Sequence, residues 1–169
     1  PKGIILDLRN NPGGYFDSAL HLSKYFFTPG SVAVKEDFGN GEIKDYRVYG
    51  NAIFAYLPTV VLVNEGSASA SEILAGALKD LNKAVLVGQT TYGKGSVQEL
   101  IPLSSNQSLK LTIAHWLTPN GTLIQGKGLA PDYVVKNVET ASSSYGKLDT
   151  KTDLQFQKAI EVIYSLLNK

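Results

Sequence analysis

Residues 59–73 read TVVLVNEGSASASEI, and this stretch indicates the class of the fold. Its first five residues are an apolar run rich in β-branched side chains, which predicts a buried strand. The following Asn, Glu and Gly predict a turn. From Ser69 to Leu81 the spacing of the apolar residues predicts a helix. A buried strand that leads directly into a helix is typical of a layered α/β fold.

The segments on either side of this stretch follow similar patterns. The other predicted elements are strands at residues 3–8, 31–50 (a pair), 84–87, 96–101 and 109–113, helices at 15–27 and from Asp153 onward, a hairpin turn at 118–121, and a polar loop at 137–150. We therefore expect an α/β or α+β layered fold in which a mixed sheet is flanked by helices.

The composition excludes several classes of protein. A chain of 169 residues with 43% apolar and 18% charged residues is long enough for one globular domain. The net charge of +1, without a basic or acidic block, gives no electrostatic support for nucleic-acid or membrane-surface binding. No apolar run is long enough for a membrane span. The chain has no Met and no visible signal peptide, so we expect a fragment or a mature piece.

The residues most often used in metal sites are scarce. There is no Cys, and only two His, His21 and His115. Neither His has a partner pattern typical of a zinc site, and no G-x-S-x-G elbow accompanies them for a Ser-His-Asp triad. We expect both histidines to be structural and predict no metal and no cofactor.

Three stretches of small and polar residues follow predicted strands, where α/β folds place ligands. They read DLRNNPGG (residues 7–14), NEGSASASEI (64–73) and TTYGKGSVQ (90–98). The paired Gly13 and Gly14 before a helix leave backbone N–H groups open to an anion or oxyanion. The alternative is a tight turn that needs glycine for its dihedral angles.

The second stretch offers three candidate nucleophiles, Ser67, Ser69 and Ser71. One of them could simply cap the helix, with Glu72 in its first turn. Flanking alanines leave a serine hydroxyl accessible, however, and helix N–H groups could stabilise negative charge beside it. The residue pattern alone does not choose among the three.

The third stretch places Lys94 between two glycines. A serine hydroxyl needs a base to take its proton, and lysine can serve only when it is neutral. Burial favours the neutral amine, so we expect Lys94 to pack among the neighbouring apolar strands. Gln98 lies four residues further on and could orient the amine without a charge.

Residues 88–94 also fit the start of a phosphate-binding loop, G-x-x-x-x-G-K. Gly95 stands where that loop requires Ser or Thr, and a strand is predicted where it requires a helix. Nucleotide binding is therefore a remote alternative.

Together these stretches resemble the carboxy-terminal processing proteases, the tail-specific peptidases of family S41. Residues 78–80 and 126–132 extend the resemblance. It implies that Ser69 is the nucleophile, that Lys94 is its general base and that Gln98 positions the lysine. It also implies that the backbone N–H groups of Gly14 and Ala70 form the oxyanion hole.

The resemblance further implies a fold similar to the crotonase and ClpP-like ββα architecture. Asp80 matches a conserved acid, expected to be structural rather than catalytic. Residues 1–136 would form the catalytic core, with a PDZ domain expected before it. Residues 137–169 would form a polar loop and a helix that could help the protein to dimerise.

The implied function is that of a serine endopeptidase that cleaves extended protein substrates near their C-termini through an acyl-enzyme. The family resemblance implies an extracytoplasmic location. The alternative is a peptide-binding core whose catalysis is impaired by missing parts.

Overall fold

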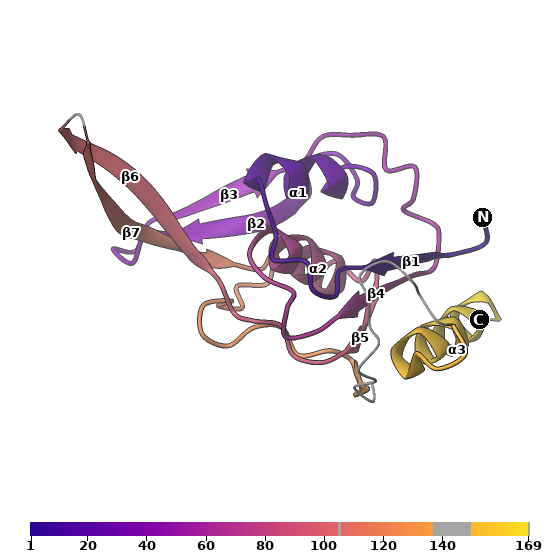
Figure 1. Cartoon of the computed structure of the whole chain (residues 1–169). Helices are drawn as coiled ribbons and strands as arrows, with labels where there is room; N and C mark the ends of the chain where they lie inside the picture. The colour runs from indigo at the N-terminus through magenta and orange to yellow at the C-terminus, as the bar shows by residue number, and fades with distance from the viewer. Residues whose placement is uncertain (105, 137–149, 169) are drawn as a thin grey trace.

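A parallel sheet forms the centre of the molecule. The computed structural model describes residues 1–104, 106–136 and 150–168 (Figure 1). The sheet has the order β1-β4-β5-β8, with all three pairings parallel. Its strands are β1 (Ile4–Asp7), β4 (Thr59–Val63), β5 (Val85–Gly88) and β8 (Tyr133–Val134). All five residues of β4 are buried, as expected for a parallel strand covered on both faces.

Helices cover both faces of this sheet. Alternate residues of β4 point in opposite directions, so Val61 and Val63 join one hydrophobic cluster and Val60 and Leu62 join another. The first cluster includes apolar side chains of α2 (Ala70–Asp80), and the second those of α3 (Leu154–Leu167). The short helix α1 (Phe16–Ser23) lies beside α2 (Figure 1).

The other four strands form an antiparallel sheet. They are β2 (Val32–Asp37), β3 (Ile43–Arg47), β6 (Ser96–Ser104) and β7 (Gln107–Leu117), in the order β3-β2-β7-β6. The β6–β7 hairpin extends well beyond the body of the molecule (Figure 1).

Aromatic side chains attach α1 to this second sheet. The Phe16 ring stacks on Trp116 at 4.6 Å between centroids and meets Tyr46 edge-on at 4.9 Å. The Tyr46 hydroxyl donates a 2.6 Å hydrogen bond to Glu36. Burial together with this bond raises the pKa of Tyr46 above its ordinary value.

The predicted fold class is confirmed, and most predicted elements are present. The strands divide between a parallel and an antiparallel sheet, which the prediction of one mixed sheet did not separate. The predicted helix at residues 15–27 ends at Ser23, because the next carbonyl groups, of Lys24 and Tyr25, accept bonds from Ala52 and Phe54 instead.

Two further outcomes concern the C-terminal part of the chain. The two-residue strand β8 was not predicted, because it is too short for a periodic pattern. Most of the predicted polar loop, residues 137–149, lies outside the described residues.

Among the helices that the structure describes, none is long and apolar enough to cross a bilayer.

The position of Leu62 yields a stability prediction. Leu62 is fully buried on the face of β4 that packs against α3. We expect Leu62→Ala to lower the free energy of unfolding by about 2–5 kcal/mol, because it removes apolar contacts and leaves a cavity. Leu103→Ala, at a side chain that is 64% exposed, is the matched control and should change it by less than about 0.5 kcal/mol. Urea denaturation measures both, and equal effects would contradict this view of the core.

Candidate functional site

The three stretches singled out from the sequence follow adjacent parallel strands and meet at the carboxyl edge of the sheet. Hydrogen bonds join the loop after β1 to the loop after β4. The Ser67 hydroxyl donates to the carbonyl oxygen of Leu8 at 2.7 Å, and the Ala68 N–H donates to that of Asn11 at 3.0 Å. The side chains of Asn10 and Asn64 also bond each other at 2.9 Å. The turn that carries the candidate serines is therefore fixed to the glycine-containing loop.

The three candidate serines differ in exposure and backbone conformation. Ser67 and Ser71 are buried, at 1% and 5% exposure, whereas Ser69 is half-buried and caps the N-terminus of α2. Ser69 has φ of 56°, a region that residues other than glycine rarely adopt. Such strained residues concentrate at functional sites. Ser69 is thus the most accessible of the three and lies at a sharp strand-to-helix turn.

The loop after β1 packs directly against this turn. Gly13 has φ of +94°, and a Cβ added there would lie 2.6 Å from the Ala68 carbonyl oxygen and 2.8 Å from the Ala70 nitrogen. Only glycine allows this approach. Within the described part of the chain, the N–H groups of Gly14 and Ala70 donate no hydrogen bond. Both are free to bind a negatively charged oxygen.

A buried carboxylate joins this turn to the third stretch. Glu72 is fully buried, and its Oε2 accepts hydrogen bonds from the N–H groups of Ser69 at 3.0 Å and Lys94 at 2.8 Å. Its Oε1 accepts the Gly93 N–H at 2.7 Å and the Thr91 hydroxyl. Glu72 therefore fixes the backbone of Ser69 relative to that of Lys94.

The sequence had suggested only half of this role for Glu72. The Ser-x-x-Glu spacing predicts a capping box, and the bond from the Ser69 N–H fits it. The donors from residues 91–94 lie about twenty positions further along the chain, so no local pattern could reveal them. A signal was available only in the placement of a charged residue within residues 70–78, which are all buried and carry no other charge.

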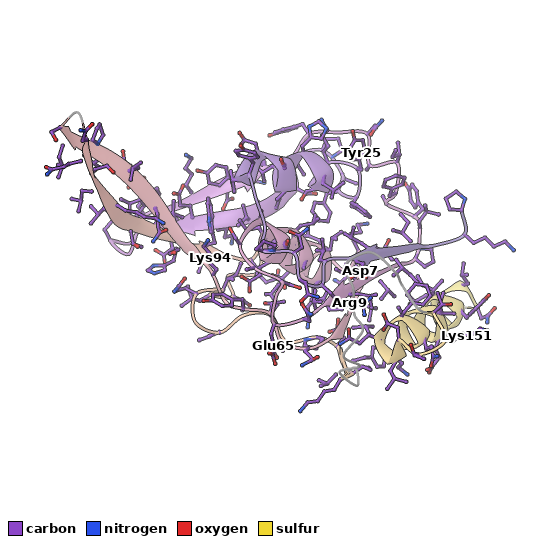
Figure 2. All side chains as sticks on the ribbon, viewed as in Figure 1. Asp7, Arg9, Tyr25, Glu65, Lys94 and Lys151 are labelled. Carbon is purple, nitrogen blue, oxygen red and sulfur yellow. The ribbon has the colours of Figure 1, made fainter. Side chains whose placement is uncertain are left out.

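Lys94 does not have the environment expected from the sequence. Its side chain is exposed (labelled in Figure 2), although burial was expected. A Cβ added to Gly93 would lie 2.9 Å from the Gly128 nitrogen, and one added to Gly95 2.5 Å from the Gln125 nitrogen. The two glycines thus face the interior, and Lys94 between them faces outward.

Gln98 is likewise exposed, on β6. Among the residues that the structure describes, no hydrogen bond joins the side chains of Ser69, Lys94 and Gln98. The structure thus brings the backbones of Ser69 and Lys94 together through Glu72, without joining the three side chains.

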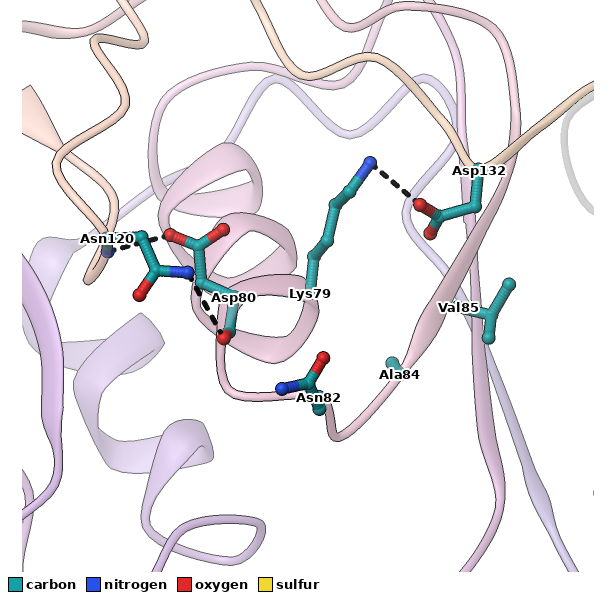
Figure 3. A pocket seen from close by; sticks show the side chains of 7 residues that line it. All are labelled: Lys79, Asp80, Asn82, Ala84, Val85, Asn120 and Asp132. Atoms are coloured by element: carbon teal, nitrogen blue, oxygen red, sulfur yellow. Dashed lines mark hydrogen bonds and ion pairs between the residues drawn. The ribbon is translucent and has the colours of Figure 1, made fainter.

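Asp80 lies at the other end of α2 from Ser69, about 16 Å away at 1.5 Å per residue. Its Oδ2 accepts the Asn120 N–H at 2.8 Å, and Lys79 beside it pairs with Asp132 at 2.9 Å (Figure 3). Asp80 thus holds the 118–121 turn against α2 and touches none of the other candidate residues. Among the described residues, no three His, Cys, Asp or Glu side chains cluster in a way that could hold a metal ion.

Comparisons with known proteins agree with these features. Residues 1–135 match the sequence profile of peptidase family S41. The chain is 44% identical over 135 residues to a carboxy-terminal-processing protease of Bartonella bacilliformis, covering 80% of this chain and 31% of that protein. It is 40% identical over 154 residues to the carboxy-terminal processing protease CtpB of Bacillus subtilis, covering 91% and 32%.

Solved structures give the same relationship. The photosystem II D1 C-terminal processing protease matches with a TM-score of 0.76 and 38% identity, covering 80% of this chain and 35% of that one. A lipoprotein from Streptococcus agalactiae, at a TM-score of 0.75 and 22% identity over 98% of this chain and 55% of that one, shares the fold. The chain spans about a third of the length of the curated relatives that it matches. On this evidence, the chain belongs to peptidase family S41.

Proposed function

We propose that this chain is the catalytic core of a serine endopeptidase that cleaves protein substrates near their C-termini, with Ser69 as nucleophile and Lys94 as general base. The observation that carries the proposal is the arrangement around Ser69. Its hydroxyl lies at the N-terminus of α2, the N–H groups of Gly14 and Ala70 donate no hydrogen bond among the described residues, and Glu72 anchors the Lys94 loop to the same turn. The names of the relatives support cleavage near the C-terminus.

The proposed reaction is acyl transfer in two steps. The Ser69 oxygen attacks the peptide carbonyl carbon while the Lys94 amine takes the hydroxyl proton. The N–H groups of Gly14 and Ala70 stabilise the oxyanion, and the C–N bond breaks as Lys94 returns the proton to the leaving amine. Lys94 then deprotonates a water molecule, which hydrolyses the acyl-enzyme and regenerates Ser69.

The exposed position of Lys94 requires one more step. A neutral lysine is favoured when water is excluded, and Lys94 is exposed in this chain. We infer that a substrate bound along residues 94–98 covers the lysine, with Gln98 orienting its amine. We propose further that a PDZ domain, which the resemblance leads us to expect before this core, captures the substrate C-terminus.

The same exposure favours a second candidate function. If Lys94 never reaches Ser69, the core would bind extended peptides without cleaving them. We propose a structural role for Asp80 in either function, supported by its bonds to Asn120 in the 118–121 turn.

Glu72 has a distinct role in the proposed mechanism. It touches neither the scissile bond nor the reacting oxygen, so it is a positioning residue. All four of its hydrogen-bond partners are donors, which suits a carboxylate that can only accept. A glutamine in its place would direct an NH₂ group at N–H donors and leave at least one of them unsatisfied.

Substitutions test the nucleophile and the base. In the full-length protein, Ser69→Ala and Lys94→Ala should each lower kcat for casein by about 10⁴-fold or more, because each removes a reacting group. Lys110→Ala, at an exposed lysine of β7, is the matched control and should retain activity. Labelling by a fluorophosphonate should disappear in Ser69→Ala. If Lys94→Ala cleaves casein as fast as Lys110→Ala, Lys94 is not the base. If the unmodified protein binds peptide without cleaving it, the core is a peptide-binding module and not a peptidase.

A substitution at Glu72 tests its positioning role. We expect Glu72→Gln to lower kcat by roughly 10- to 100-fold, because the backbones of Ser69 and Lys94 lose their common anchor. The free energy of unfolding should also fall, by about 1–3 kcal/mol. Glu65→Gln, at an exposed residue of the turn after β4, is the control and should change neither quantity appreciably. Equal kcat values for the two variants would show that Glu72 does not position the site.

A further inference from the structure

Arg9 lies in the loop between β1 and the Gly13–Gly14 turn, and partners surround its guanidinium group. Its Nε and one terminal nitrogen bond the two oxygens of Asp7 at 2.9 and 2.7 Å (both residues are labelled in Figure 2). The other terminal nitrogen reaches the Asp153 carboxylate at 2.7 Å and the Gln155 amide oxygen at 3.1 Å. The Arg9 side chain is only 11% exposed. It is therefore held between the end of β1 and the first turn of the C-terminal helix.

The partners from the C-terminal helix are themselves fixed in place. Asp153 is the N-cap of α3, and its Oδ1 accepts the Phe156 N–H at 2.9 Å while its Oδ2 pairs with Arg9. Gln155 is 1% exposed, and its amide donates to the Val135 carbonyl oxygen at 2.8 Å. The first turn of α3 thus connects the loop after β1 to the segment after β8.

Arg9 forms ion pairs with both Asp7 and Asp153. Burial alone would lower the pKa of Arg9, but hydrogen bonds and the charges of Asp7 and Asp153 outweigh burial and raise it. The guanidinium group therefore stays charged, and each carboxylate that it touches compensates part of that charge. Removing one partner from a half-buried ion pair leaves the remaining charge poorly compensated.

Contacts on two sides hold the Gly13–Gly14 turn in place. No atom lies within 4 Å of a Cβ added at Gly14, and Tyr15 is 85% exposed. The turn is held from one side by its contact with the Ser69 turn. Arg9, four residues before Gly13, holds the other side to α3, although Gln155 is 146 positions away in the sequence.

We propose that Asp153 and Gln155 are positioning residues of the oxyanion hole, which act through Arg9 on the loop that carries Gly14. This inference rests on the proposed function, because it assigns the loop a role in stabilising the oxyanion. The helix α3 is then more than a cover for the sheet, because its first turn determines how precisely the loop positions Gly14.

The test uses substitutions that preserve the helix. Asp153→Asn retains an N-cap residue but removes the charge, and Gln155→Leu retains side-chain volume but removes the amide that bonds Arg9 and Val135. Glu161→Gln, at an exposed residue of the same helix, is the matched control. In the full-length protein, we expect kcat for a peptide substrate to fall about 10- to 100-fold in the first two variants, with KM changed less than about twofold.

Two further measurements separate positioning from stability. Amide hydrogen exchange at residues 10–14 should accelerate in Asp153→Asn and Gln155→Leu and remain unchanged in Glu161→Gln. In an Arg9→Lys background, which already lacks the forked guanidinium, Asp153→Asn should lower kcat much less than in the unmodified protein. Unchanged kcat and exchange in both variants would overturn the proposal, as would a fall in kcat of the same size in the Arg9→Lys background.

The outcome remains interpretable if the proposed function is wrong. In that case the unmodified protein neither cleaves peptide nor reacts with a fluorophosphonate, and only exchange reports on the link. Faster exchange at residues 10–14 would then support the connection between α3 and the loop while counting against peptidase activity. Unchanged exchange would overturn the connection itself.

Discussion

The hydrogen bonds to the Glu72 carboxylate link the parts of the site that the sheet alone would only bring near one another. A fully buried carboxylate is costly unless its charge is compensated, and here three backbone N–H groups and one hydroxyl do so. Those donors belong to two separate loops. The hydrogen bonds that compensate the buried charge of Glu72 therefore also fix the two loops relative to each other. Neither loop can move without leaving a buried charge less well compensated.

The parallel sheet makes this arrangement possible. In a parallel sheet the carboxyl ends of adjacent strands lie at one edge, so the loops after β1, β4 and β5 converge although they are far apart in the sequence. Glycine then allows backbones to touch where side chains would separate them. Gly13 approaches the Ser69 turn in this way, and Gly93 approaches residues 126–128. The strand order therefore brings the loops close together, and the glycines and Glu72 fix how the loops contact one another.

The sequence predicted the fold class and the loops that follow the buried strands, because both follow from local patterns. Apolar runs followed by turn residues predicted β1, β4 and β5, and with them the edge where the loops meet. What local patterns could not predict were interactions between distant segments. The bonds from residues 91–94 to Glu72 and from Arg9 to Asp153 are of this kind, as are the contacts that end α1 at Ser23. The exposure of Lys94 was missed because its flanking glycines take the inward-facing positions.

These observations divide the candidate site into a fixed part and an adjustable part. Backbone hydrogen bonds and buried charges hold Ser69, Ala70 and the loop of Lys94, whereas the Lys94 side chain projects from that loop without a described partner. A lysine on a rigid loop can change its rotamer without disturbing the fold, since only side-chain torsions have to move. On the proposed mechanism, control of activity therefore has to act where water is excluded from Lys94, because the nucleophile turn is already in place. A substrate that covers residues 94–98 would both supply the scissile bond and create the environment in which the base can work, which couples binding to catalysis.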